Sequence, residues 1–443
     1  MSENNLITVT IDGVQVQVTP DDTILTAANL AGIEIPTLCY LKGLNPEGSC
    51  RMCLVEVEGN AKGLVTACTQ PCTDGMVVHT KSEKVIEARR FVLDLLLSNH
   101  EGNCFSCAKN GGCKLQDYCF EYGVEKTSFE TPVQPDRPEP DYSNKFLAYD
   151  PKKCILCRRC QRTCAKIQGK GVLSVSNRGF NAAITTSFEM PWDNTDCEHC
   201  GNCAAACPTG ALVTKDNLNN YRPYNIKKVR TTCPHCATGC QMDLIVRDNK
   251  IVGCEPADGE SNHNTLCVKG RFGSFKFVHS GDRITDPLIK DKETGKFRKA
   301  GWDEALDLVA SRFMQIKKEY GPDSLAGFAC SRSPNEDIYM VQKMVRTCFG
   351  TNNTDNCARV CHSASVSGLA MTLGSGAMTN PIYDITHDVD AILLVGSNPE
   401  EAHPVVGAQI RQAVQNGTQL IVVDPRDIGL AKSAAVHLKL RPG

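Results

Sequence analysis

The sequence predicts an α+β chain of several domains: a small β-rich domain, cysteine-rich segments whose folding depends on metal, and an α/β domain. Alternating apolar residues on both sides of Asp12-Gly13 predict an N-terminal β-hairpin. Most of the 26 cysteines occur in short, regularly spaced groups. Near the C-terminus, the apolar runs Val389 to Val395 and Leu420 to Val423 enclose a helical pattern from Val405 to Asn416, which predicts a βαβ unit of a parallel sheet.

Composition narrows the class of protein. A chain of 443 residues with 41% hydrophobic content can build several sizeable cores. The net charge of −2, with Lys and Arg dispersed along the chain, predicts no nucleic-acid partner. The N-terminus shows no leader pattern, and the longest apolar run, Phe91 to Leu97, is too short for a membrane span. We therefore expect a cytoplasmic, reducing compartment in which the cysteines are metal ligands.

Residues 1–80 are predicted to form a β-grasp domain. Strands with one apolar face run from Ile7 to Ile11 and from Val14 to Val18, and a short helix ends near Gly32. Four thiolates after this helix can hold a [2Fe–2S] cluster, with a zinc site as the alternative. These ligands are Cys39, Cys50, Cys53 and Cys68. Cys72 lies outside this spacing and is predicted to pack in the core.

Residues 81–130 are predicted to form a second cluster domain. Apolar residues at helical spacing predict a helix from Glu83 to Ser98, directly before a histidine and three cysteines. The predicted [4Fe–4S] ligands are His100, Cys104, Cys107 and Cys113, with Cys119 as the alternative to the histidine. Imidazole ligation removes one negative charge and tends to raise the cluster potential. A proline-rich, extended linker is predicted for residues 131–149.

Residues 150–220 carry the most specific pattern. Two runs with the spacing C-x₂-C-x₂-C-x₃-C match the two-cluster ferredoxin signature, in which the fourth cysteine of each run ligates the other cluster. One predicted [4Fe–4S] set is Cys154, Cys157, Cys160 and Cys207, and the other is Cys197, Cys200, Cys203 and Cys164. The proline that follows the second run has no counterpart after the first, where Ala165 stands.

Two further groups lie C-terminal to the ferredoxin pattern. Residues 228–285 contain Cys233, Cys236, Cys240 and Cys267, which suit a fourth [4Fe–4S] cluster or, as the alternative, a zinc ribbon. Cys361 is followed directly by His362. Such a pair can act as nucleophile and base, or as a soft metal ligand beside a proton-transfer group, but neighbours of this kind also arise by chance.

The motifs resemble two known families. Residues 1 to about 215 resemble the iron–sulfur part of the complex I large subunit and the matching part of iron-only hydrogenases, on PTLCY, GSCRMCLVEVEG and LQDYCFEYGV. Residues 228–443 resemble the start of a molybdopterin oxidoreductase, closest to formate dehydrogenases. The motifs are CPHCATGC, LCVKGRFG, WDEAL, NCARVCHSASVSGLA, GSGAMTN, VGSNPEEAHPV and VVDPR. The combination resembles the catalytic subunit of soluble NAD-linked or electron-bifurcating formate dehydrogenases.

The resemblance implies further roles. Cys361 would ligate molybdenum or tungsten, His362 would take part in proton transfer, and Lys269 would lie between the fourth [4Fe–4S] cluster and the pterin. Gly396, Asn398, Asp424 and Arg426 would contact the guanine-nucleotide end of a bis-pterin cofactor. Complete family members continue beyond Gly443, so the α/β domain at residues 286–443 is expected to be incomplete and the pterin is expected to be weakly held or absent.

The implied function is formate oxidation or CO2 reduction, with electrons relayed through one [2Fe–2S] and four [4Fe–4S] clusters. The implied partners are flavin- and NAD-binding iron–sulfur subunits, or ferredoxin. The alternative is a non-catalytic wiring subunit of an NADH- or ferredoxin-linked hydrogenase or related complex, in which the pterin domain is vestigial. The retained Cys361-His362 pair and Lys269 favour the first function, and the missing part of the α/β domain favours the second.

Overall fold

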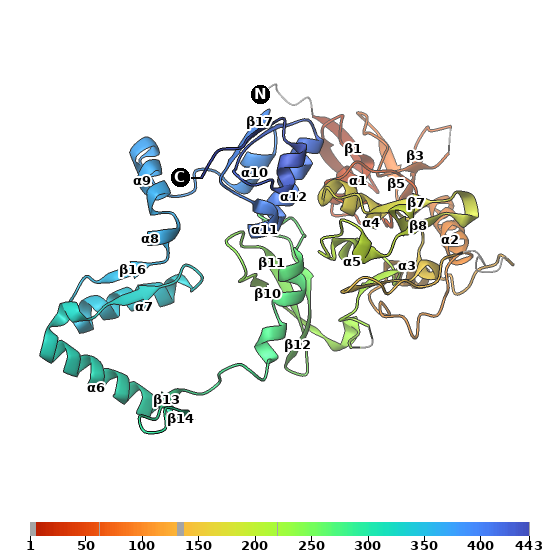
Figure 1. Ribbon diagram of the computed structural model, residues 1–443. Helices are drawn as coiled ribbons and strands as arrows, with labels where there is room; N and C mark the ends of the chain where they lie inside the picture. Colours follow the sequence, from red (N-terminus) through yellow and green to blue (C-terminus); the bar gives the residue numbers. More distant parts are fainter. Residues whose placement is uncertain (1–5, 62, 131–136, 219, 443) are drawn as a thin grey trace. The chain divides into compact units, whose positions relative to one another are not determined.

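The computed structural model describes residues 6–61, 63–130, 137–218 and 220–442 (Figure 1). The chain forms two compact units, which are described separately. The first unit comprises Met1–Cys233, Cys240–Phe275 and Thr386–Gly443, and the second comprises Pro234–Gly239 and Lys276–Ile385. The α/β domain predicted for residues 286–443 is therefore divided between the units. No helix among the described residues is long and apolar enough to cross a membrane.

The N-terminal part of the first unit is a five-stranded sheet with one short helix. The strand order is β2-β1-β5-β3-β4, and β1 and β2 form the predicted antiparallel hairpin, with Ile11 opposite Val14. Asp12 and Gly13 adopt positive φ angles of 46° and 87°, as a tight hairpin turn requires. Helix α1 is capped by Thr23. The elements are β1 (Ile7–Ile11), β2 (Val14–Val18), α1 (Ile24–Leu30), β3 (Leu54–Val57), β4 (Val65–Thr66) and β5 (Val77–His79).

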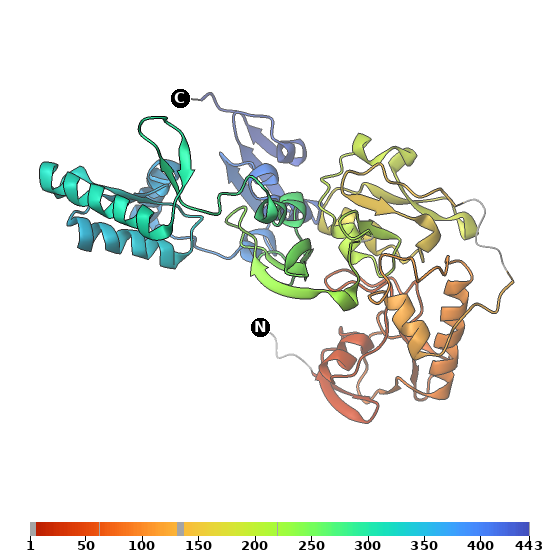
Figure 2. The ribbon, with the colours of Figure 1, turned by 90° about the horizontal axis from the view of Figure 1, so that it is seen from below.

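Two helices follow, and they share a core with the β-grasp region. Helix α2 spans Glu83–Leu97, close to the predicted range, and α3 spans Lys114–Glu121 (Figure 2). Leu93 of α2 and Tyr118 of α3 pack in one apolar cluster with Leu38 and Met52 of the preceding domain. The loop that carries His100 and the three following cysteines therefore lies between two helices that are fixed against the [2Fe–2S] domain.

The cysteine-rich middle of the first unit consists of two short antiparallel ribbons and short helices. Its core cluster contains Cys154, Cys160, Cys203 and Cys207 beside apolar residues such as Trp192. Cysteines thus make up much of the interior, which agrees with the prediction that metal supports this fold. The elements are β6 (Leu147–Tyr149), α4 (Arg159–Arg162), β7 (Leu173–Ser176), β8 (Ala183–Thr186), α5 (Asn202–Ala206) and β9 (Leu212–Thr214).

The predicted linker, residues 131–149, is only partly extended chain. Residues 131–136 lie outside the described residues. The end of the segment is β6, which pairs with β9 and is buried throughout. Asn144 is buried and donates a hydrogen bond from Nδ2 to Cys197 Sγ at 3.8 Å. The linker prediction is therefore wrong for Leu147–Tyr149, because these residues form a buried strand of the ferredoxin core. The prolines of the segment favoured an extended linker and gave no indication of this strand.

The remaining parts of the first unit are a three-stranded antiparallel sheet and a three-stranded parallel sheet. Strands β17 and β18 are parallel with α11 and α12 between them, so the predicted βαβ unit is confirmed, and β19 adds a third parallel strand. The elements are β10 (Lys227–Thr232), β11 (Gln241–Arg247), β12 (Lys250–Pro256), β17 (Ala391–Val395), α11 (Pro399–Ala402), α12 (Pro404–Gln415), β18 (Gln419–Val423) and β19 (Val436–Leu438).

The βαβ unit packs with the ferredoxin region because α12 contacts the π-helical turn Thr163–Ile167 and the loop after it. Arg411 Nε donates to the Gln168 carbonyl at 3.0 Å, and the Gln415 side chain donates to the Gly169 carbonyl at 3.3 Å. Arg411 also forms ion pairs with Glu198 and Glu400. These contacts explain why Thr386–Gly443 belongs to the first unit.

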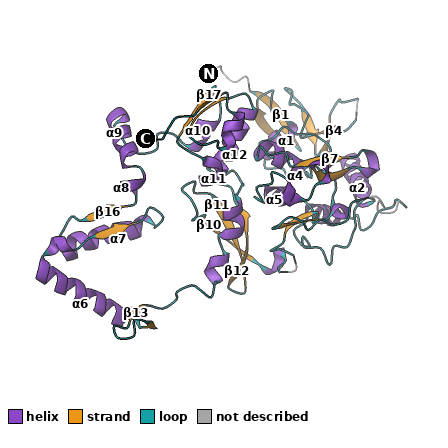
Figure 3. Cartoon of the chain, in the orientation of Figure 1, coloured by secondary structure: helices purple, strands orange, loops and turns teal. Residues whose placement is uncertain are grey.

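The second unit is mainly helical (Figure 3). Its small core consists of Leu325, Val345 and Phe349, with Phe313 and Ile316 packed against them. Strands β15 and β16 form a two-stranded parallel sheet, and β13 and β14 form an antiparallel ribbon. The elements are β13 (Leu288–Lys290), β14 (Phe297–Lys299), α6 (Trp302–Tyr320), β15 (Gly327–Ala329), α7 (Asn335–Met344), β16 (Thr354–Asn356), α8 (Ala358–Cys361) and α9 (Ser363–Leu373), and α10 (Ile382–Thr386) crosses the boundary of the units.

Candidate iron–sulfur and pterin sites

The four cysteines of the predicted [2Fe–2S] site come together as two pairs. Cys53 Sγ lies 3.4 Å from Cys68 Sγ, and the Cys39 and Cys50 thiols are also hydrogen-bonded to each other. The Cys50 thiol, by donating a hydrogen bond, lowers the pKa of Cys39. A [2Fe–2S] cluster takes four thiolates, two on each iron, and the two pairs fit that requirement.

The spare cysteine of this domain has a different environment. Cys72 is buried, and burial, with a smaller effect from Asp22, raises the pKa of its thiol to about 11. It therefore stays protonated at neutral pH and packs in the core with Val78 and Ile24. This position agrees with the predicted packing role.

The histidine-containing group lines one open cavity. His100, Cys104, Cys107 and Cys113 all line it, whereas Cys119 does not. Burial, followed by the charges of Arg137 and Lys153, lowers the pKa of His100 to about 4, so the imidazole is neutral at pH 7. Its buried Nδ1 has no hydrogen-bond partner in the part of the chain that the structure describes. A neutral imidazole with an unpaired nitrogen is the form that binds metal, so these residues fit a cluster.

A glycine makes room for this cavity. A Cβ at Gly210 would collide with Cys107 Sγ. Gly210 follows the last cysteine of the ferredoxin pattern by three positions, and it also lines the cavity. The spacing of the cysteines does not indicate this residue, because only the fold brings it beside the second cysteine group.

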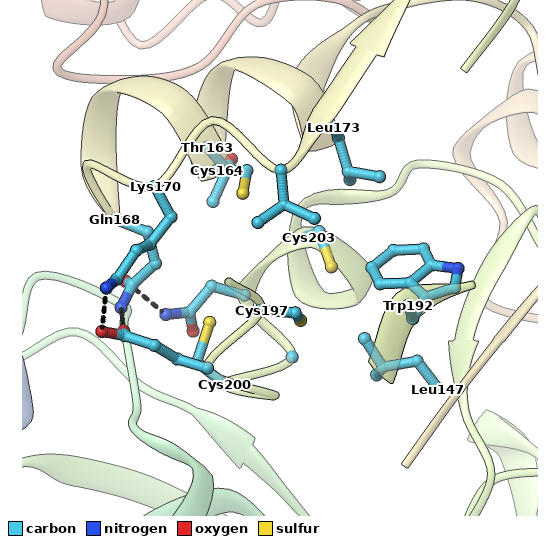
Figure 4. A pocket seen from close by; sticks show the side chains of 14 residues that line it. Leu147, Thr163, Cys164, Gln168, Lys170, Leu173, Trp192, Cys197, Cys200 and Cys203 are labelled. Atoms are coloured by element: carbon cyan, nitrogen blue, oxygen red, sulfur yellow. Dashed lines mark hydrogen bonds and ion pairs between the residues drawn. The ribbon is translucent and has the colours of Figure 1, made fainter. Parts of the chain in front are cut away.

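One ferredoxin ligand set lines a second open cavity. Cys164, Cys197, Cys200 and Cys203 line it together with Leu147, Leu173 and Trp192 (Figure 4). The His199 N–H donates to Cys197 Sγ at 3.4 Å, a bond that would favour a thiolate or cluster sulfur there. Burial raises the pKa of the Cys200 thiol to about 12, so metal binding would have to displace its proton.

The other ferredoxin set is buried in the same core. Burial is the largest cause that raises the pKa of Cys157, and the next is the charge of nearby Cys207. Cys154, Cys160 and Cys207 belong to one packed cluster. The Leu156 N–H donates to Cys154 Sγ at 3.4 Å. The fold therefore brings the distant Cys207 to the first run, as the exchanged ligation pattern predicts.

Three of the four cysteines of the last group belong to the first unit. Cys233 and Cys240 share a buried cluster, and the Cys233 N–H donates to the Cys240 carbonyl at 2.9 Å. A Cβ at Gly270 would lie 3.5 Å from Cys233 Sγ, which places the turn after Cys267 beside the first cysteine. Cys236 falls in the segment Pro234–Gly239 of the second unit, so its ligand role stays a prediction. The exposed Lys269 begins the π-helical turn Lys269–Gly273.

Two of the cysteine sets line cavities, and neither set converges on a single point. Among the described residues, no three His, Cys, Asp or Glu side chains come close enough to hold a single metal ion. A tetrahedral zinc site needs all its ligands within about 2.0–2.3 Å of one ion, whereas a cluster spreads its thiolates over several irons. Cluster ligation by these groups therefore rests on the spacing of the cysteines and on the cavities that two of the groups line.

The four residues of the implied nucleotide site lie together at one edge of the parallel sheet. Gly396 and Asn398 follow β17, and Asp424 and Arg426 follow β18. Ligands of open α/β sheets bind at the carboxyl ends of the strands. Asn398 Oδ1 is buried and has no hydrogen-bond partner within the described ranges. This free acceptor and the sheet edge fit a bound nucleotide.

The Asp424 carboxylate and the Arg426 guanidinium follow β18 at this edge of the sheet. The Asp424 carboxylate accepts from Arg426 Nε at 3.2 Å and from the Arg426 N–H at 2.8 Å. The Arg426 side chain holds the pKa of Asp424 below its ordinary value. His437 Nε2 donates to the Asp424 carbonyl at 3.0 Å. The carboxylate is therefore held in place by Arg426 and charged at neutral pH.

Cys361 and His362 lie in the second unit. Cys361 ends α8, and His362 occupies the break between α8 and α9, with a φ of −150°. Both side chains are exposed. An exposed thiol at a helix break is accessible to a soft metal, so Cys361 fits a ligand role. The position of this pair relative to Lys269 and the nucleotide edge is a prediction, since these belong to the other unit.

Buried arginines next to the cysteine loops are a further feature that the sequence patterns did not predict. Each of these arginines donates a side-chain hydrogen bond to the backbone carbonyl of a predicted cluster cysteine or of a residue next to one. The bonds are Arg89 to Met52, Arg137 to Cys154, Arg162 to Cys39 and Arg271 to Cys200. No spacing pattern marks them, because each arginine reaches a loop distant in sequence or in a neighbouring domain.

Five family models match successive parts of the chain. The matches are a 2Fe-2S iron-sulfur cluster binding domain (residues 4–83), an NADH-ubiquinone oxidoreductase-G iron-sulfur binding region (89–128), an NADH-quinone oxidoreductase subunit 3 ferredoxin-like domain (145–213), a molybdopterin oxidoreductase Fe4S4 domain (226–279) and molybdopterin oxidoreductase (283–443). The predicted order of domains is confirmed. Residues 283–443 are thus similar to molybdopterin oxidoreductases, and residues 89–128 and 145–213 are similar to iron–sulfur regions of NADH oxidoreductases.

Particular relatives extend along nearly the whole chain. The NADPH-Fe(3+) oxidoreductase subunit alpha of Geobacter sulfurreducens is 38% identical over 99% of this chain and 50% of that protein. The second G-type subunit of the NADH-quinone oxidoreductase of Rhizobium meliloti is 36% identical, with the same coverage. "Putative formate dehydrogenase SH0748" of Staphylococcus haemolyticus is 30% identical over 98% of this chain and 47% of that protein. The chain spans about half the length of the curated relatives it matches.

Proposed function

We propose that this chain is the cluster-bearing part of a formate-oxidising, CO2-reducing catalytic subunit that passes electrons to a flavin- and NAD-binding partner. The proposal is based on the presence, in one chain, of the cysteine groups that would hold the electron-transfer clusters and of the Cys361-His362 pair that would serve the catalytic metal. Four cysteine groups line cavities or share cores in the first unit, and the exposed Cys361-His362 pair lies in the second. When bound, the clusters would supply one-electron carriers and the pterin metal a two-electron centre.

The residues of the chain have distinct parts in this proposal. The cysteine sets and His100 would hold one [2Fe–2S] and four [4Fe–4S] clusters. Cys361 would ligate molybdenum or tungsten, and His362 would accept the proton when formate is oxidised to CO2. Gly396, Asn398, Asp424 and Arg426 would hold the nucleotide end of the pterin at the sheet edge. Lys269 would lie between the Cys233 group and the pterin.

A second candidate is a non-catalytic wiring subunit of an NADH- or NADPH-linked complex. Two relatives favour it, since their names are those of NADH-quinone and NADPH-Fe(3+) oxidoreductase subunits. The two candidates share the clusters but differ in the metal at Cys361. Only the first requires molybdenum or tungsten and a formate-dependent reaction.

Formate-dependent reduction of a viologen dye by the purified holo complex distinguishes the candidates. The proposal predicts dye reduction that Cys361→Ala abolishes, with iron content unchanged. Cys348→Ala is the matched control, since Cys348 is also an exposed cysteine of the second unit. An active Cys361→Ala complex, or a wild-type complex with neither molybdenum nor tungsten by elemental analysis, would reject the proposal in favour of the wiring subunit.

A further inference from the structure

Arg271 connects two cysteine groups within the first unit. It follows Cys267 by four positions, and its N–H donates to the Cys267 carbonyl at 3.0 Å. Its side chain is 2% exposed, and Nε donates to the carbonyl of Cys200 at 2.8 Å. One guanidinium from the ligand segment of the last cluster group thus lies against a ligand loop of the ferredoxin region.

A buried asparagine fixes the Arg271 guanidinium. Asn202, which lies between Cys200 and Cys203, accepts from Arg271 Nη2 at 3.1 Å. The same side chain donates to the Leu266 carbonyl and accepts from the Leu266 N–H, both at 3.1 Å. Leu266 directly precedes Cys267. The two ligand loops are therefore held together by side-chain hydrogen bonds from both sides.

The ferredoxin loop has a glycine, Gly201, where the Arg271 side chain approaches it. Gly201 has a φ of +73°, and a Cβ at this position would lie 2.5 Å from Arg271 Cδ and 2.7 Å from Nε. The next residue after the arginine, Phe272, stacks on Phe146 with ring centroids 4.5 Å apart. Both backbone conformation and packing thus require the side chain to approach the Cys200 loop closely.

Arg271 differs from the buried Arg411 and Arg162 in having no carboxylate at ion-pair distance among the described residues. Arg411 is paired with Glu198 and Glu400, and Arg162 Nε lies 3.8 Å from Glu47. Arg271 forms no ion pair with any residue that the structure describes. Burial lowers its pKa, yet a guanidinium stays protonated in proteins. The full charge therefore acts on the surrounding cysteines, among them Cys200 and Cys203, and on the Glu255 carboxylate.

We propose that Arg271 is a positioning residue that sets the reduction potential of the cluster held by Cys164, Cys197, Cys200 and Cys203. Reduction adds one electron to the cluster and makes it more negative, with no bond formed or broken. A fixed buried cation stabilises the reduced form, because charge interactions are strong away from water. Arg271 thereby raises the potential of this cluster. The inference rests on the proposed ligand set.

An EPR-monitored redox titration of the full chain with its clusters tests the inference, with dithionite as the electron donor. Arg271→Met removes the charge and the hydrogen bonds. We expect its ratio of reduced to oxidised cluster to fall about tenfold at a fixed potential, equivalent to about 59 mV for a one-electron couple. Arg271→Lys retains the charge and is expected to shift less. Cys164→Ser identifies which signal belongs to this cluster.

A pair of glycine variants tests the geometry without removing the arginine. Gly201→Ala would push the guanidinium away and shift the same signal in the same direction. Gly179→Ala is the matched control, because Gly179 also has a positive φ, of +60°, but has no atom within 4 Å of an added Cβ. We expect no shift in the control.

Three outcomes are decisive. Equal potentials in wild type and in an Arg271→Met protein with full iron content would overturn the inference and leave the ligand set intact. If Arg271→Met does not load iron, a tenfold shift in Arg271→Lys would overturn it instead, since the charge is retained there. Absence of any EPR signal sensitive to Cys164→Ser in the loaded wild-type protein would instead contradict the proposed ligand set itself.

Discussion

The two units differ in which residues form their interiors. In the first unit, cysteines from distant segments meet in buried cores or line cavities. In the second, the helices α6, α7 and α9 contain no buried residue among those described. Leu306 and Val309 of α6 are 58% and 49% exposed. The first unit thus depends on ligands for its interior, whereas the second depends on secondary structure that forms locally.

Removal of iron should produce the largest effect and separate the two units. Chelation under anaerobic, reducing conditions would leave buried cysteines around empty cavities, so residues 150–218 should lose their protection against hydrogen exchange. Helix α6 should keep its protection, because no predicted cluster ligand lies in it. Mass spectrometry of peptides from both regions measures this. Equal loss in both, or loss in neither, would contradict the comparison.

Exchange of one ligand cysteine should remove a single cluster. Cys53→Ser should eliminate the [2Fe–2S] EPR signal and about two iron atoms per chain, because one thiolate of a four-cysteine site is lost. Cys72→Ser is the control, since both cysteines are buried in the same core. Iron analysis with EPR checks the pair. An intact [2Fe–2S] signal in Cys53→Ser, or its loss in Cys72→Ser, would mean that the ligands are assigned wrongly.

His100→Cys should alter a potential without loss of a cluster. The thiolate adds a negative charge to a site that already has a cavity and three cysteines, so the cluster should form and its reduction potential should fall. A redox titration measures the fall, and His100→Ala should lose the cluster. If Cys119 were the fourth ligand, His100→Ala would keep its iron and Cys119→Ala would lose it.

The smallest expected effect concerns the packing of α12 on the ferredoxin region. A Cβ at Gly169 would lie 2.9 Å from Arg411 Cβ, whereas one at Gly171 would have no atom within 4 Å, and both glycines have a φ of +67°. Gly169→Ala should therefore lower the free energy of unfolding by about 1 kcal/mol more than Gly171→Ala. Denaturant titration measures the difference, and equal values would show that this contact does not constrain the fold.

Sequence predicted the parts of this molecule that depend on local spacing. The cysteine runs, the Asp12-Gly13 hairpin and the βαβ elements all follow from residues that are close in the chain, and the observed elements agree with them. Cys207 was assigned to the distant first run only because the two-cluster pattern is specific.

Other features depend on contacts between distant segments and could not be predicted. Strand β6 lies in a proline-rich segment and was not predicted, because its partner, β9, lies more than sixty residues later in the sequence. The roles of Arg271 and Gly210 appear only once the fold brings separate cysteine loops together. The division of residues 286–443 between two units likewise follows from the contacts of Arg411 with the ferredoxin region.

The number and type of clusters in the full chain test the account most directly. Mössbauer spectroscopy of the ⁵⁷Fe-loaded protein, combined with iron analysis, resolves [2Fe–2S] from [4Fe–4S] iron. The account predicts about 18 iron atoms per chain, of which about two belong to a [2Fe–2S] cluster and the rest to four [4Fe–4S] clusters. Zinc in place of iron at the Cys233 group, or a chain that binds fewer than four cubane clusters after complete reconstitution, would contradict it.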